Sequence, residues 1–379
     1  MPTPERPPRA RPRAGAKAGA ILDIDLDAIA SNWTLLHERV TPAARCAAVV
    51  KADAYGLGIS EVAPALARAG CKTFFVATLD EGLELRALLP RAQIAVLDGL
   101  VMGAPADFAK GGLMPVLNDL GQVSAWQTYA ARRGKLPAML QIDTGMRRLG
   151  LSPKELRALA RDPSPLDGFN LAMILSHLAC ASEPAHPMNL EQLELFRAAL
   201  RALPRAPASL SASSGIFLGS DFCHDLVRPG AAIYGVNPLP GRPNPMKQVL
   251  HLKAKILQVR DVDRGESVGY GAAQHMERAG RIATLAMGYA DGWLRSSSHR
   301  GTARIGGKPA PVIGRISMDL ITIDVTGIDP AAVQPGTYAD LLDERYGVDD
   351  AAHAADTIGY EVLTALGRRC VRVYRRGNR

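Results

Sequence analysis

A lysine that ends an apolar run is the first residue of this sequence with nucleophilic chemistry to offer. Lys51 closes residues 47–51, directly after four small apolar residues. An apolar setting disfavours the charged ammonium, so it lowers the pKa and leaves a nucleophilic amine. A lysine at a strand end can equally be a solvated charge. The two interpretations are separated by what else lies at the same edge.

Polar side chains also lie at the ends of other apolar runs. They are Arg148, His177, Ser213, Ser214 and Arg228. One such histidine or arginine is usually structural, whereas five polar strand ends on one face favour a site. The pairs Ser214-Gly215 and Gly230-Ala231 would present backbone N–H groups to a phosphate, as the last two βα loops of a barrel commonly do.

Parallel strands are the elements that could bring these groups to one edge. Between residues 21 and 235, short apolar runs alternate with helical patterns. The predicted strands are 47–51, 73–77, 94–97, 113–117, 138–142, 172–176, 209–212 and 231–234. The predicted helices are 26–40, 60–69, 79–89, 120–133, 153–161 and 188–202. Eight such units predict an α/β fold, a (β/α)₈ TIM-type barrel. A doubly wound open sheet competes, but its glycine fingerprint is missing after the first strand.

The second half of the chain has a different pattern. Apolar and polar residues alternate with Gly and Asp turns between them, which predicts a mainly antiparallel β domain. Its predicted strands are 250–262, 281–287, 302–305, 311–318, 321–325 and 370–374. The proline-rich stretch 238–245 is the predicted linker. The predicted domains are a barrel at 21–242 and a β domain at 243–379.

Composition narrows the function classes. The net charge is +8, and half of it lies in residues 1–20, a predicted disordered basic leader that has five basic residues and one acidic residue. The body has few aromatic residues, so a nucleic-acid partner is not expected. No apolar stretch is long enough for a membrane span. The five cysteines are widely spaced without a C-x-x-C pair, so neither disulfides nor a metal site is indicated and a cytoplasmic location is expected.

Several motifs resemble those of the alanine racemases, enzymes that depend on pyridoxal phosphate (PLP). The stretch AVVKADAYGLG at 48–58 resembles the family's PLP-lysine motif. Further similar motifs follow in order: DIDLDAI at 23–29, DTGM with RLG at 143–150, SH at 176–177, RPG with YG at 228–235, GYADG at 288–292, GRISMD at 314–319 and IGYE at 358–361. The resemblance covers about residues 21–375. It implies a PLP-bound barrel, a β domain and a head-to-tail homodimer with shared active sites.

The resemblance also implies roles for individual residues. Lys51 would carry PLP and act as one base, and Tyr270 of the partner subunit would be the second base, tuned by His177. Racemisation removes a proton from one face of Cα and returns it on the other, so two bases suit it. Arg228 would donate to the cofactor's ring nitrogen without leaving a proton there, which limits side reactions.

Further implied contacts concern the cofactor phosphate and the substrate. The implied phosphate ligands are Tyr55, Ser214, Gly230, Ala231 and Tyr360. The substrate carboxylate would be held by Arg148 and the backbone of Met318, with Tyr289 and Tyr360 narrowing the entrance to favour a methyl side chain. Tyr234, in contrast, is expected to be a packed core residue with a satisfied hydroxyl.

One position departs from the family pattern. Many members have a lysine, often carbamylated, where this chain has Gln141. A neutral amide cannot supply the negative charge that positions Arg148, so we expect either a bound anion such as chloride or a direct amide hydrogen bond to Arg148.

The expected reaction is the interconversion of L-alanine and D-alanine, which would supply D-alanine for peptidoglycan. A broader-specificity racemase of the same fold is the first alternative. A non-catalytic PLP-binding barrel protein is the second, and the long β domain argues against it. A PLP-dependent decarboxylase would need an acidic group where this chain has Arg228.

Overall fold

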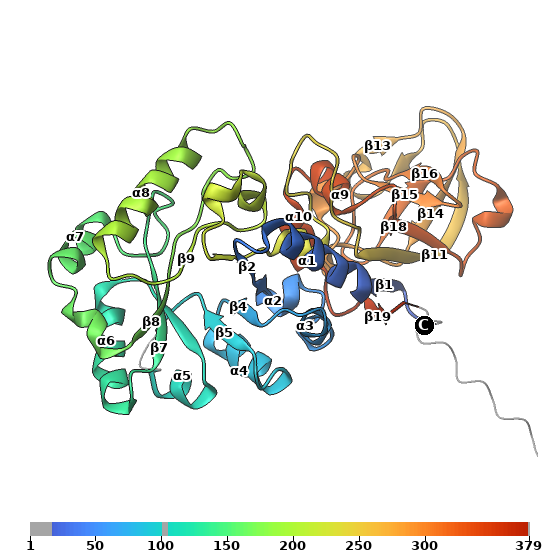
Figure 1. The fold of residues 1–379 in the computed structure, drawn as a ribbon. Coiled ribbons are helices and arrows are strands. Elements are labelled where there is room, and N and C mark those ends of the chain that lie inside the picture. Colours follow the sequence, from blue (N-terminus) through green and yellow to red (C-terminus); the bar gives the residue numbers. More distant parts are fainter. Residues whose placement is uncertain (1–16, 101–104, 378–379) are drawn as a thin grey trace, which may run out of the picture. The chain divides into compact units, whose positions relative to one another are not determined.

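The computed structural model describes residues 17–100 and 105–377 of the chain. They divide into two compact units (Figure 1). The barrel unit contains residues 26–249 together with the short segment that begins at Arg376, and the β unit contains residues up to Asp25 together with 250–375. The predicted leader, residues 1–20, lies outside the described residues as far as residue 16. Ala18 and Gly19 accept hydrogen bonds from Tyr338 and Lys255 within the β unit.

Parallel strands form the centre of the barrel unit. They follow one another in sequence order as β3 (Ala48–Val49), β4 (Thr73–Val76), β5 (Gln93–Val96), β6 (Met114–Leu117), β7 (Pro137–Gln141), β8 (Asn170–Leu175) and β9 (Ala208–Ser209). All four residues of β4 are buried, as are Val116, Leu117 and Leu140. Continuous burial is expected of strands covered on both faces, and it explains their uninterrupted apolar sequences.

A short strand, β10 (Leu226–Val227), closes this sheet into a barrel. It pairs in parallel with β2 (Arg45–Cys46), and the N–H of Val49 donates to Pro229. On its other side, the N–H of Arg228 donates to Ser211 across 2.9 Å, just beyond β9. The predicted barrel class is therefore confirmed. The predicted eighth strand is wrong, because Ala231–Tyr234 forms a 3₁₀ turn, η5, after Pro229 has interrupted the strand.

Helices surround the strands of the barrel unit (Figure 1). They are α1 (Leu26–Val40), α3 (Ile59–Arg68), α4 (Leu79–Leu88), α5 (Pro105–Gly111), α6 (Leu120–Ala130), α7 (Pro153–Arg161) and α8 (Met188–Ala202). Two of them begin with a capping box, in which a hydroxyl and a glutamate satisfy the first N–H groups: Thr78 with Glu81, and Ser152 with Glu155. The pattern at 26–40 predicted α1 to the residue, whereas α5 was not predicted.

The β unit is built on a largely antiparallel sheet around β11 (Leu250–Val262). The other strands are β1 (Ala20–Asp25), β12 (Ser267–Val268), β13 (Gln274–His275), β14 (Gly280–Leu285), β15 (Thr302–Ile305), β16 (Lys308–Pro311), β17 (Ile321–Asp324), β18 (Tyr338–Leu342) and β19 (Val371–Arg375). Because β1 pairs with β11 and β19, residues 20–25 belong to this unit, which differs from the predicted barrel start at residue 21.

Two further details of the β unit differ from the predictions. The strand expected at 311–318 ends at Pro311, and the chain then turns through Gly314, whose φ is 69°. Two short helices, α9 (Val348–Ala354) and α10 (Gly359–Ala365), were not predicted. Two of the candidate site residues, Met318 and Tyr360, lie in the segments concerned.

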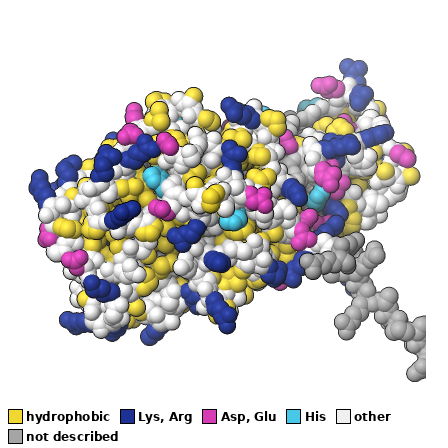
Figure 2. Space-filling model, viewed as in Figure 1, with side chains coloured by type: hydrophobic (Ala, Val, Ile, Leu, Met, Phe, Trp, Pro, Cys, Tyr) yellow, Lys and Arg dark blue, Asp and Glu magenta, His cyan; other side chains and the backbone are white. Residues whose placement is uncertain are grey.

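The surface carries charges of both signs (Figure 2), and the cysteines are not joined by disulfides. On the face seen in Figure 2, Lys and Arg side chains are dispersed, with acidic side chains between them. All five cysteines fall within the described residues and are free thiols. Within 17–100 and 105–377, no helix combines the length and apolarity of a bilayer crossing, and no group of three or more His, Cys, Asp or Glu residues is placed to hold a metal ion.

Candidate active site

Lys51 lies on an unusual turn rather than at the end of a straight strand. The chain leaves β3 and enters α2 (Lys51–Tyr55), where Ala52 to Tyr55 all have φ between 53° and 56°. Four successive non-glycine residues in the left-handed region are rare, because each costs about 1–2 kcal/mol. Strain of this kind persists only where surrounding contacts impose it, and it is concentrated at functional sites.

The contacts that impose this turn come from two carboxylates. Glu81 accepts hydrogen bonds from the N–H of Ala52 at 2.6 Å and from the N–H of Ala77 at 2.7 Å. Asp53 accepts from the N–H of Ile59 at 2.7 Å. The turn ends at Gly56, whose φ of 81° continues the left-handed conformation without a steric penalty. The turn therefore fixes the backbone from which the Lys51 amine projects.

Arg228 is a buried guanidinium at the end of β10. Its side chain donates to the hydroxyl of Ser209 at 2.5 Å and to the carbonyl of Ser176 at 2.6 Å. It also donates to Nδ1 of His177 at 3.4 Å. Burial lowers the pKa of Arg228 to about 10, so the guanidinium remains charged at neutral pH.

His177 stands among three positive charges. Burial, followed by the charges of Arg228, Arg148 and Lys51, lowers the pKa of His177 to about 3. Its imidazole is therefore neutral at neutral pH. Because a guanidinium can only donate, Nδ1 of His177 is the acceptor and Nε2 carries the proton. Three of the residues that the sequence singled out, Lys51, Arg148 and Arg228, therefore lie close enough to His177 to lower its pKa.

Tyr55 and the loop after β10 form a tight corner. A Cβ added at Gly230 would run into the hydroxyl of Tyr55, so only glycine fits there. The N–H groups of Gly230 and Ala232 donate to the hydroxyl of Ser213, at 3.1 and 3.2 Å. Among the residues described, no acceptor is found for the N–H of Ala231 or for the hydroxyl of Ser214. Tyr234 donates to the carbonyl of Val49, so its predicted structural role is confirmed.

Gln141 does not make the amide contact that the sequence suggested. Its Nε2 donates to the carbonyl of Leu149 at 3.3 Å rather than pairing with Arg148. The prediction of a direct bond to Arg148 is wrong in this structure: no hydrogen bond joins the two side chains, and the Gln141 side chain lies against the backbone of its own loop near Gly150. The alternative, a bound anion, stays a prediction.

The remaining predicted site residues lie in the β unit, and all four are exposed. Tyr270 is 68% exposed and follows Gly269 in the η6 turn (Tyr270–Ala272). Tyr289 begins η7 (Tyr289–Asp291), Met318 lies between β16 and β17, and Tyr360 is the second residue of α10. Within one chain the predicted site residues are therefore divided between the two units.

Comparisons with known proteins identify the family. Alanine racemase domain models match residues 24–238 (N-terminal domain) and 249–374 (C-terminal domain). An alanine racemase from Rhodospirillum rubrum is 50% identical over 360 residues, which are 94% of this chain and 96% of that protein. The chain belongs to the alanine racemase family.

Other racemases agree with this assignment. A catabolic alanine racemase from Mesorhizobium japonicum is 47% identical and covers 96% of this chain and 95% of its own length. The crystal structure of an alanine racemase from Bartonella henselae, with covalently bound pyridoxal phosphate, superposes with a TM-score of 0.91. It is 43% identical over 94% of this chain and 99% of that one. The predicted family, fold class and enzyme class are confirmed.

Two polar residues of this racemase fold were missed when the site was read from sequence. Glu81 lies at the start of a helix, where the T-x-x-E spacing at 78–81 indicates a capping box. No local pattern indicates that Glu81 also accepts a hydrogen bond from the N–H of Ala52. Ser213 was noted only as a strand end, and its role as acceptor for the Gly230 loop depends on the barrel closing.

Proposed function

We propose that the protein interconverts L-alanine and D-alanine with PLP held covalently on Lys51, and that it supplies D-alanine for peptidoglycan. The observation that carries this proposal is a cluster of unpaired cations. Three positive charges lower the pKa of His177: those of Lys51, Arg148 and Arg228. Within the described residues, none of the three has a carboxylate at ion-pair distance. Charges of one sign are stabilised by a ligand of the other sign, which here means an anionic cofactor and a substrate carboxylate.

The residues present fit PLP. The N–H of Ala231 and the hydroxyl of Ser214 have no acceptor among the described residues and would donate to the cofactor phosphate. Tyr55 and Gly230 would contact the same phosphate, and their close approach leaves no room for a side chain at Gly230. Tyr360 of the partner subunit would add a further hydroxyl. When bound, PLP supplies the electron sink that makes the Cα proton of an amino acid labile. Arg228 would donate to the ring nitrogen and leave no proton on it, since guanidinium stays charged.

Proton transfer would be divided between two bases on opposite faces of Cα. The Lys51 amine would take or return the proton on one face, and the phenol of Tyr270 of the partner subunit on the other. His177 supports this arrangement, since its Nδ1 accepts from Arg228 and its Nε2–H is left to donate. A hydrogen bond donated to a phenolate lowers the pKa of the phenol, which brings Tyr270 closer to the working pH.

Substrate binding would combine charge and size. Arg148 is exposed and has no ion-pair partner among the described residues, and its guanidinium can bind both oxygens of a carboxylate. The N–H of Met318 would complete the carboxylate site from the partner subunit. Tyr289 and Tyr360 would narrow the access to about a methyl group. The homodimer that this arrangement needs is supported by the exposure of Tyr270, Tyr289, Met318 and Tyr360 in the single chain.

Solvent exchange tests the reaction directly. L-Alanine incubated with the enzyme in deuterated water should yield D-alanine that carries deuterium at Cα. Release of carbon dioxide would instead indicate a decarboxylase, and unchanged L-alanine would overturn the proposal. Borohydride reduction followed by peptide mapping should place the cofactor mass on the peptide that contains Lys51; a label on another lysine would overturn the assignment of Lys51. A chirality assay across several amino acids separates a specific alanine racemase from the broader-specificity alternative.

A further inference from the structure

Two loops of the β unit are joined through their backbones. The N–H of Tyr289 donates to the carbonyl of Ser317 at 3.1 Å, and the N–H of Ala290 donates to the carbonyl of Met318 at 2.9 Å. Gly288 lies so close that an added Cβ would run into both carbonyl groups. The loop that carries Tyr289 and the loop that carries Met318 therefore form one interlocked element.

This interlock also fixes the direction of one amide. In a trans peptide the C=O and the N–H point in opposite directions. The carbonyl of Ser317 and the N–H of Met318 belong to the same peptide, so the bond from Tyr289 to Ser317 turns the Met318 N–H away from Tyr289. Among the described residues, no acceptor is found for that N–H, while the carbonyl of Met318 is satisfied.

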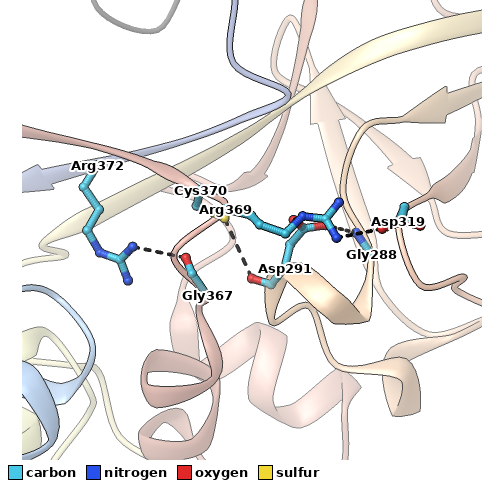
Figure 3. A network of polar contacts seen from close by, with 7 residues as sticks. All are labelled: Gly288, Asp291, Asp319, Gly367, Arg369, Cys370 and Arg372. Atoms are coloured by element: carbon cyan, nitrogen blue, oxygen red, sulfur yellow. Dashed lines mark hydrogen bonds and ion pairs between the residues drawn. The ribbon is translucent and has the colours of Figure 1, made fainter.

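Arg369 holds the two loops together from outside. Its Nε lies 2.9 Å from Oδ1 of Asp291, and its Nη1 lies 2.7 Å from Oδ1 of Asp319 (Figure 3). The other oxygen of Asp291 accepts from the N–H of Gly288 at 2.8 Å. One guanidinium thus bridges a carboxylate that closes the Tyr289 loop and a carboxylate that adjoins Met318.

Burial makes the Asp291 half of this bridge the stronger one. The Asp291 side chain is only 5% exposed, whereas those of Arg369 and Asp319 are 55% and 54% exposed. A buried carboxylate needs its partners, since an unpaired buried charge is costly. The carbonyl of Asp291 is also fixed, by the N–H of Gly367 at 2.8 Å, just before Arg369 in the chain.

We propose that Arg369 is a positioning residue for the substrate carboxylate. By holding Asp291 and Asp319 together, it keeps the Tyr289 loop against Ser317 and so keeps the Met318 N–H aimed outward. Arg369 itself does not touch the substrate. This role rests on the proposed function, in which the Met318 N–H binds the carboxylate of alanine.

Binding and turnover measurements on the holoenzyme test this role. The variant Arg369→Ala should raise KM for both L- and D-alanine by about tenfold and change kcat much less, as the loss of a contact made equally in the ground state and the transition state does. The dissociation constant of acetate, a non-reacting carboxylate probe, should rise by a similar factor in calorimetry. Arg369→Lys keeps the charge but loses the fork that reaches two carboxylates, so it should give a smaller increase in both quantities.

Arg375→Ala is the matched control. Arg375 is also an exposed arginine that pairs with a buried aspartate, Asp23, but it contacts neither loop. Its removal should leave KM and acetate binding unchanged. If the wild-type enzyme is active and both Arg369 variants keep its KM and its acetate affinity, the proposed role of Arg369 is overturned. An equal effect of Arg375→Ala would overturn it as well. A wild-type protein that does not racemise alanine would instead overturn the proposed function. If Arg369→Ala does not fold, the Lys variant decides the question.

Discussion

Arg228 donates a hydrogen bond through Nη2 to Nδ1 of His177 across 3.4 Å. That single contact determines the tautomer of the histidine, because a guanidinium has no lone pair to accept with. It also explains part of the low pKa of His177, since a second positive charge beside a guanidinium is unfavourable. The imidazole is thus neutral and presents an N–H donor, the form that could stabilise a phenolate.

The charge state of His177 can be followed by NMR. With a pKa of about 3, the ¹⁵N shifts of His177 should remain those of a neutral Nε2–H ring between pH 5 and 8. The His177→Gln variant assigns the signal by removing it. A titration midpoint of the His177 ¹⁵N shifts between pH 6 and 7 would contradict this prediction.

The same pKa shift makes stability depend on pH. Because the pKa of His177 is lower in the folded than in the unfolded chain, the unfolded chain binds more protons between about pH 3 and 6.5. The contribution of His177 to stability is therefore lost as the pH falls through that range.

Glu81 should control the geometry of Lys51. In Glu81→Gln one of the two carboxylate oxygens becomes an amide NH₂, which faces either Ala52 N–H or Ala77 N–H as donor to donor. A hydrogen bond to a charged group contributes about 1.5–3 kcal/mol, so the strained turn should loosen when one of these bonds is lost. We expect a drop in kcat/KM of about tenfold or more together with a changed absorption band of the bound cofactor. Glu84→Gln, an exposed residue of the same helix, is the control and should change neither. An unaltered absorption band in Glu81→Gln would show that the turn holds without this carboxylate.

Periodic segments were predicted from sequence far better than the turns that carry the site. The helix Leu26–Val40 and the strand Leu250–Val262 match their predictions to the residue. The helix buries one face along its length, and the strand alternates buried and partly buried residues from Leu250 to Ile256. The left-handed turn after Lys51 could not be predicted, because no local preference favours four non-glycine residues with positive φ.

Hydrogen-bond partners explain the other differences. Ala231–Tyr234 has the apolar character of a strand, but the strand bonds that close the barrel are made by Leu226–Val227. Likewise, the pairing of β1 with β11 depends on residues more than 200 positions apart in the sequence, so no pattern near residue 21 indicates it. The candidate site residues were predicted through family motifs. The contacts of Glu81 with Ala52 and of Arg369 with Asp291 and Asp319 could not be predicted, because they join residues far apart in the sequence.

Gly230 should be intolerant of any side chain. In Gly230→Ala the new Cβ would run into the hydroxyl of Tyr55, and overpacking of this kind typically costs about 1–3 kcal/mol. Because both residues are proposed to contact the cofactor phosphate, we expect PLP to bind the apoenzyme about tenfold more weakly in a fluorescence titration. Tyr55→Phe removes the clashing oxygen, so Gly230→Ala should cost less in that background than in the wild type. Strictly additive effects of the two substitutions would argue against a direct clash.

Mixing two inactive variants tests whether active sites are shared between subunits. Lys51→Ala removes one proposed base and Tyr270→Phe the other, so each homodimer should lose activity by at least about 10² in one or both directions. If a site combines Lys51 of one protomer with Tyr270 of the partner subunit, a mixed dimer contains one site with both bases intact. Random exchange of protomers, after mild denaturation and refolding of the mixture, should then restore about a quarter of the wild-type activity. Refolding each variant alone is the control.

Two outcomes would contradict the shared site. If the mixture shows no gain in racemase activity although mass spectrometry verifies mixed dimers, each chain builds its site from its own residues. A Tyr270→Phe homodimer that loses activity equally in both directions would indicate that Tyr270 is structural rather than a base.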